Sequence, residues 1–128
     1  MKNVTLAVFV LATAICRADL FDNEAQLQLR YGKPAQISAD SRLYRWGGIY
    51  VAVQLKDIGW GFKVSVSEAY KREDGGRLTA SDIEKCLPSR ATGGKWIKHS
   101  DTMWRLGHKA IVARLVEQDT MIIVRRVK

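Results

Sequence analysis

Apolar and polar residues alternate with a period of two over most of this chain, and two short stretches change to helical spacing. Residues 22–31 have apolar positions at roughly helical intervals after a capping residue, Asp22 or Asn23, and Gly32 ends the pattern. A second helix is predicted after Thr79, a good N-cap residue, and it ends before the next proline. Two short helices are therefore expected within a chain made mainly of strands.

Strands follow each predicted helix. Residues 42–46, the turn Gly47-Gly48 and residues 49–55 form the clearest hairpin. The next run is predicted to turn one apolar face to the core: Trp60, Phe62, Val64 and Val66. A polar, glycine-containing loop is predicted over residues 71–77. Three more strands are predicted after the second helix, over residues 102–106, 110–116 and 120–127.

The chain also resembles itself after a shift of 60 residues. Nine of the fifty residues at 19–68 are identical to those at 79–128, including Arg45 with Arg105, where composition alone gives about three. We therefore predict an internal duplication, with half-repeats at about 19–70 and 78–128. The predicted fold class is α+β: one domain over 19–128, built from two helix-plus-three-strand meander repeats, with the helices packed on one face of an antiparallel sheet.

Residues 1–18 have the pattern of a secretory signal peptide, with Lys2, an apolar run at 4–15 and the small-residue exit Cys16-Arg17-Ala18. The apolar run is shorter than the roughly 20 residues that a membrane-spanning helix needs. The expected location is secreted or periplasmic, without a transmembrane segment after cleavage. Lipid attachment at Cys16 is the alternative. Cleavage would leave Cys86 as the only cysteine of this sequence, so no disulfide could form within it.

The chain has 21 Lys and Arg against 13 Asp and Glu, a formal net charge of +8. In an exported protein this charge favours an anionic envelope component or a protein as the partner, and makes nucleic acid unlikely. Basic and aromatic residues gather in the second half, which makes them candidate binding residues. They are Trp96, Lys98, Trp104, Arg105, Lys109, Arg114, Arg125 and Arg126. The alternative interpretation of the same cluster is a solvated strand edge, whose charges block aggregation with other sheets.

The candidates for catalysis are few. His99, Asp101 and His108 could form a metal or acid–base site only if the strands fold them together. Cys86 with a histidine could form a thiol nucleophile, but its apolar neighbours favour a buried cysteine. We also expect no carboxyl group in an apolar pocket. No catalytic, metal or cofactor site is therefore predicted.

Short motifs carry a resemblance to known proteins. The sequence Tyr31-Gly32-Lys33-Pro34 before a meander, Leu78-Thr79 at a helix start and Trp96 in the next loop resemble a group of small exported bacterial proteins of unassigned function. More distantly, the order of elements is similar to the SmpA/OmlA envelope-assembly lipoproteins and to the β-lactamase inhibitor protein, a tandem repeat of helix-plus-sheet units. The resemblance implies a repeated helix-and-sheet fold and transfers no binding residue.

The sequence thus predicts an exported, non-enzymatic binding or envelope-associated module. The alternatives are a small hydrolase or metal-dependent enzyme that uses His99, Asp101 and His108 or Cys86, and a proteinaceous inhibitor of an exported enzyme.

Overall fold

The computed structural model describes residues 22–87, 95–107 and 111–126, so the predicted signal peptide, Lys109 and His108 lie outside the described residues. The helices are α2 (Glu24–Tyr31) and α3 (Ala80–Cys86). The strands are β1 (Gln36–Ile37), β2 (Ser41–Trp46), β3 (Ile49–Asp57), β4 (Lys63–Arg72), β5 (Trp96–Ser100), β6 (Met103–Leu106), β7 (Ile111–Val116) and β8 (Met121–Arg126).

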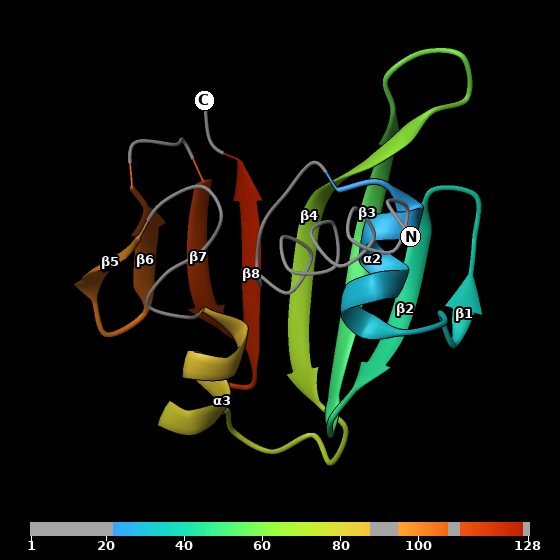
Figure 1. The fold of residues 1–128 in the computed structure, drawn as a ribbon. Coiled ribbons are helices and arrows are strands. Elements are labelled where there is room, and N and C mark those ends of the chain that lie inside the picture. Colours follow the sequence, from blue (N-terminus) through green and yellow to red (C-terminus); the bar gives the residue numbers. More distant parts are fainter. Residues whose placement is uncertain (1–21, 88–94, 108–110, 127–128) are drawn as a thin grey trace, which may run out of the picture.

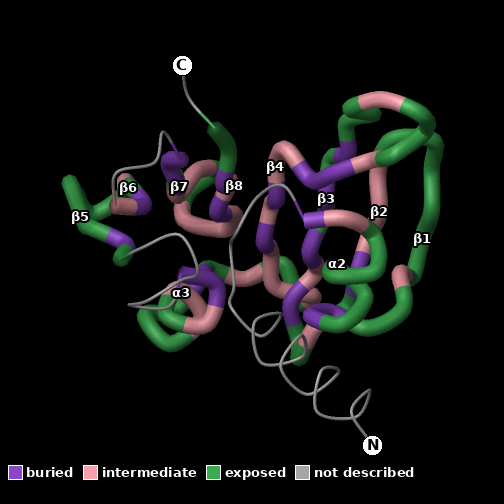
Figure 2. Tube along the Cα trace, turned by 45° about the horizontal axis from the view of Figure 1, so that its top comes forward, coloured by how far each residue is buried: buried purple, intermediate pink, exposed green. Residues whose placement is uncertain are grey.

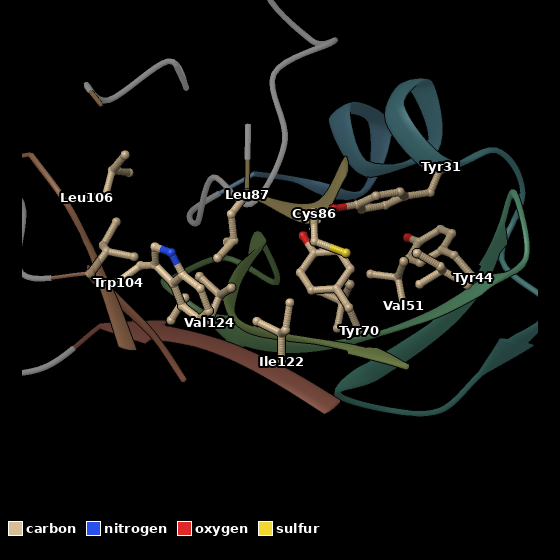
Figure 3. Packing of buried hydrophobic residues seen from close by; sticks show 14 of the residues in the cluster. Tyr31, Tyr44, Val51, Tyr70, Cys86, Leu87, Trp104, Leu106, Ile122 and Val124 are labelled. Atoms are coloured by element: carbon tan, nitrogen blue, oxygen red, sulfur yellow. Dashed lines mark hydrogen bonds between the residues drawn. The ribbon is translucent and has the colours of Figure 1, made fainter. Parts of the chain in front are cut away.

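All eight strands belong to one antiparallel sheet, in the order β1-β2-β3-β4-β8-β7-β6-β5 (Figure 1). The first four strands form one half of the sheet and the last four form the other. The halves meet where β4 pairs with β8, through five residue pairs from Ser67↔Arg125 to Lys71↔Met121. We call this pairing the seam. Both helices pack on the same face of the sheet, which leaves the opposite face open (Figures 1 and 3).

The predicted fold class is wrong: the chain is mostly one eight-stranded antiparallel sheet with two short helices, a mostly-β fold. Each half contributes four strands instead of three. The prediction missed β1, which has only two residues, and β5, in which Trp96 is buried and the other four residues are exposed. Strands at the edge of a sheet bury few side chains, as β1 and β5 do here. They therefore lack the alternation of apolar and polar residues by which a strand is recognised in a sequence.

The two helices begin where the sequence predicts. Asn23 caps α2 in a reciprocal capping box with Gln26, through two hydrogen bonds of 2.9 Å. Thr79 and Asp82 do the same for α3, at 2.9 and 3.1 Å. Because each box satisfies backbone N–H groups that the first turn leaves unpaired, it fixes the helix start. Gly32 follows α2 with a φ of 86°, a conformation that favours glycine.

The predicted hairpin at Gly47 and Gly48 is confirmed. Trp46 pairs with Ile49, and the two glycines between them have φ values of 56° and 82°. Positive φ at both turn residues gives a two-residue turn whose twist matches the flanking strands, and glycine adopts it without a steric penalty. The ammonium of Lys85 contacts the backbone oxygens of Trp46 and Gly47 at 3.2 and 3.1 Å, which ties α3 to this turn.

The core lies between the helices and the sheet and extends across the seam (Figure 3). On the β4 side it includes Tyr70 at 0 % exposure, and on the β8 side Ile122 and Val124, also at 0 %. Leu27 from α2 and Cys86 from α3 belong to the same buried cluster. Figure 2 shows most of the buried residues on the inner strands and a few on α2 and α3, whereas β1 and most of β5 at the sheet edges are exposed. One core therefore joins both halves.

The predicted core face of the third strand run holds only at Val64, because Val66 is half-buried and Ser65, predicted on the opposite face, is 0 % exposed. Trp60 and Phe62 are 106 % and 50 % exposed, and they lie in the connection between β3 and β4. Glycines at 59 and 61 with φ values of 131° and 75° break the extended backbone that alternation assumes. The polar loop also differs, because β4 continues to Arg72 and the connection to α3 starts after it.

The shift of 60 residues does not equate all structural positions. Asp22 lies before the N-cap of α2, whereas its counterpart Asp82 is the third residue of α3. Tyr44 pairs with Val51, but its counterpart Trp104 pairs with Ala113, two residues beyond a shift of 60. An alignment of the two halves therefore needs gaps, and the duplication stays a prediction.

Candidate functional site

The open face of the sheet carries three rows of side chains that run across the strands. Directly paired residues share a face, so the strand register defines each row. The first row consists of Arg45, Tyr50, Lys71, Met121 and Val116. The second consists of Gln36, Leu43, Ala52, Ala69, Ile123, Arg114 and Met103. The third consists of Ser41, Gln54, Ser67, Arg125, Val112, Arg105 and Ile97.

Positive charge dominates these rows. They hold four arginines and a lysine, and none of their positions is Asp or Glu. Arg45 is neutralised locally, because Nε lies 2.5 Å from a carboxylate oxygen of Glu73. Within the described residues, no ion pair involves Arg105, Arg114 or Arg125. These three exposed guanidinium groups are therefore available to an external anion.

The three arginines lie close together because of the strand register. Arg125 on β8 and Arg105 on β6 both flank Val112 of β7. Arg114 is two residues further along β7, in the next row on the same face. A hollow of about 130 Å³ lies in this region, lined by Val112, Arg114, Val116, Ile123 and Arg125. We call Arg105, Arg114, Arg125 and this hollow the arginine face.

The structure separates the predicted binding residues. Arg105, Arg114 and Arg125 share the open face, as described above. Trp96 and Trp104 are buried at 6 % and 9 % exposure on the helix side of the sheet (Figure 3 shows Trp104). The prediction that both tryptophans belong to an exposed aromatic and basic surface is therefore wrong. Strand alternation explains it, because residues one apart in a strand point to opposite faces.

Two further basic residues of the predicted cluster, Lys98 and Arg126, lie on the helix side of the sheet and not on the open face. Lys98 pairs with Trp104 across β5 and β6, which puts it on the helix side, and its Nζ lies 3.4 Å from Asp101. Arg126 pairs with the buried Ile111 and so also belongs to that side. The predicted site thus keeps three of its eight members on one surface, and Lys109 lies outside the described residues.

The candidate catalytic residues lie in different environments. His99 and Asp101 are exposed on the β5–β6 hairpin, whereas Cys86, the last residue of α3, is fully buried. Burial raises the pKa of the Cys86 thiol to about 12, which keeps it protonated and unreactive at neutral pH. In the described ranges, no group of three His, Cys, Asp or Glu residues has the geometry of a metal site.

A buried acid occurs where none was expected. Glu68 on β4 is 0 % exposed, and its Oε1 accepts hydrogen bonds of 2.7 Å from Tyr31 and 3.3 Å from Tyr70. The two tyrosine hydroxyls are 2.8 Å apart. Burial raises the pKa of Glu68 to about 7, against the opposing effects of Arg30 and the Tyr31 hydrogen bond. Because it has no contact with solvent, this cluster belongs to the interior and not to a binding surface.

A sequence signal for Glu68 exists. Glu68 stands two residues before Tyr70, which places both on the same side of β4, and Glu68 pairs there with the buried Val53. A bulge between Ser65 and Ser67 breaks the alternation with Val64. The predicted strand ends at Ser67, one residue before Glu68.

No protein-family model matches this chain, and no curated protein or solved structure matches it either. Neither of the described helices is long and apolar enough to cross a membrane.

Proposed function

We propose that this chain is a non-enzymatic binding module of the cell envelope, which holds an anionic partner against the arginine face. The observation that carries the proposal is the convergence of Arg105, Arg114 and Arg125 on one face, without an acidic neighbour in the same rows. Arginine presents a planar set of donors that suits phosphate and carboxylate groups. The signal-peptide pattern at residues 1–18 supports an envelope location.

The shape of the surface supports binding in preference to catalysis. The arginine face lies on regular strands, and its apolar residues, Val112 and Ile123, give it a rigid floor. Rigid strands hold the guanidinium groups at fixed spacing, which lowers the entropy lost when an extended anion binds. Net positive charge also accelerates the encounter with an anionic surface.

The test compares two sets of charge removals. Arg105, Arg114 and Arg125 are replaced by Gln in one variant, and in the matched control Lys33, Arg77 and Lys98 are replaced by Gln, so that both lose three positive charges. Titration with inorganic polyphosphate at low and high salt measures affinity, and circular dichroism checks the fold. We expect the first variant to bind about tenfold more weakly than the control, which corresponds to about 1.4 kcal/mol.

Equal losses in the two variants would show that binding follows net charge alone and would overturn the proposal. Binding that does not change between low and high salt would also contradict it, because exposed charge pairs are screened by salt.

A further inference from the structure

The connection between β3 and β4 presents apolar side chains to solvent. Ile58, Trp60 and Phe62 are 61 %, 106 % and 50 % exposed. The hairpin projects past the ends of the neighbouring strands (Figure 1). Phe62 also lines a hollow of about 420 Å³ between the hairpin and the start of α2. We call residues 58–62 the hairpin tip.

The hairpin tip is a formed turn. The N–H of Ile58 donates to the oxygen of Phe62, and the N–H of Phe62 donates to the oxygen of Gly59, both at 2.9 Å. Asp57 accepts from the N–H of Gly59 at 2.7 Å. These bonds fix the backbone of the turn that carries the exposed apolar side chains.

Trp60 has an unfavourable backbone conformation in this turn. Its φ is 60°, in the left-handed region, where a residue with a Cβ is destabilised relative to glycine. The residue also packs against nothing, since its side chain is fully exposed. Neither folding nor solubility explains a large aromatic residue at this position, whereas contact with an external apolar phase does.

Basic residues flank the hairpin tip on both strands. Lys56 precedes it on β3 and is exposed, and Lys63 follows it on β4. Lys63 is half-buried, lies 3.4 Å from Asp40 and bonds the backbone oxygen of Ala39. Asp57 lies between Lys56 and the tip, and its carboxylate accepts the N–H of Gly59 within the turn. Among the described residues Lys56 makes no ion pair, so it is the cation that the hairpin can offer to an anionic surface. An apolar tip with a tryptophan and an adjacent cation is the combination that binds at the interface of an anionic bilayer.

We propose that the hairpin tip inserts into the interface of an anionic lipid bilayer, with Trp60, Phe62 and Ile58 among the headgroups and upper acyl chains and Lys56 at the lipid phosphates. A bilayer fits better than a protein cleft for a reason of size. A stable protein interface buries about 800 Å² on each partner, whereas interfacial anchoring needs only a few apolar side chains and a nearby positive charge. The proposal uses no residue of the arginine face, so the two proposals can fail separately.

The test measures binding of the full chain to vesicles. Vesicles of phosphatidylcholine mixed with phosphatidylglycerol are compared with pure phosphatidylcholine vesicles, by co-sedimentation and by tryptophan fluorescence. We expect binding to the anionic vesicles with a blue shift of the emission, because Trp60 leaves water. The shift should be absent in Trp60→Phe, which keeps an aromatic tip, while co-sedimentation persists.

Two double variants decide the role of the tip. Trp60→Ser with Phe62→Ser should weaken co-sedimentation by about tenfold or more. The matched control, Leu29→Ser with Ile37→Ser, also removes two exposed apolar side chains, which are 51 % and 67 % exposed, and should bind as the native chain does. Lys56→Gln should weaken binding to the anionic vesicles only.

Equal vesicle binding by the two double variants would overturn the proposal. Failure of the native chain to bind anionic vesicles would overturn it as well, and would favour a protein cleft as the site that receives the tip. Polyphosphate binding should be unchanged in the Trp60→Ser, Phe62→Ser variant, which separates this result from the function proposed for the arginine face.

Discussion

The hydroxyl of Tyr31, in the last turn of α2, donates a 2.7 Å hydrogen bond to the carboxylate of Glu68 in the middle of the sheet. Glu68 lies directly between Val53 of β3 and Val124 of β8, so a single buried carboxyl group connects the first helix to the seam between the two halves of the sheet. This position makes the stability of the protein sensitive to the protonation of one group.

Glu68 should make the protein less stable as pH rises from about 4.5 to about 7. Burial raises its pKa to about 7 in the folded chain from the ordinary value of 4.5, so across this window the folded state holds a proton that the unfolded state has lost. The free energy of unfolding therefore falls by up to about 3 kcal/mol over the window and is constant above it. Glu68→Gln should remove this decrease, as measured by urea unfolding at a series of pH values. An unchanged slope in the variant would assign the pH dependence to another group.

Leu27 should be a large contributor to stability. Its side chain is 0 % exposed in the core beneath α2, and Leu27→Ala leaves a cavity there, which should lower the free energy of unfolding by about 3 kcal/mol. Leu29→Ala is the matched control, because Leu29 lies on the same helix with 51 % exposure and should change stability by less than about 0.5 kcal/mol. Chemical denaturation measures both. Similar values for the two variants would contradict the described packing of α2.

Trp60→Gly should increase stability while it removes the proposed lipid contact. Glycine adopts a φ of 60° without the Cβ penalty, and no packing is lost because Trp60 is fully exposed. The expected gain is about 0.5 kcal/mol, reduced by the greater flexibility of glycine in the unfolded chain. Thermal unfolding tests the gain, and a destabilised variant would show that the tryptophan has a structural role.

Cys86 should react with thiol reagents only after unfolding. Its thiol is fully buried and burial raises its pKa to about 12, so both access and the thiolate are missing in the folded state. In a Cys16→Ser chain, where Cys86 is the one thiol, labelling with Ellman's reagent should be slow in buffer and fast in denaturant. Rapid labelling of the folded chain would revive the thiol-nucleophile alternative.

Local features of the fold could be predicted from the sequence. The capping residues Asn23 and Thr79 and the turn at Gly47 and Gly48 act through neighbours a few positions away, so the sequence contains most of the information that determines them. The arginine face is predictable in part, because the sequence marks Arg105, Arg114 and Arg125 as candidate binding residues but does not contain the strand register that joins them.

The features that were missed depend on distant neighbours. Glu68 is buried by α2 and β8, which are far from it in the chain, and its own strand gives only the direction of its side chain. An apolar side chain such as that of Trp96 is compatible with a binding surface and with a core. Only the place of its strand in the sheet distinguishes the two. The error at Trp60 is the reverse, because a residue predicted to be buried is exposed. The alternation predicts a strand position at Trp60, whereas the residue lies in the turn between β3 and β4.

The seam has a consequence for the order in which the sheet assembles. Among the described strands, β4 and β8 are the one neighbouring pair that is not consecutive in sequence. The other pairs can form early as local hairpins, whereas the seam requires closure of a long loop, which is slow. During synthesis, the β8-facing edge of β4 therefore remains unpaired until β8 has left the ribosome. In this interval the nascent chain is most exposed to strand-to-strand aggregation.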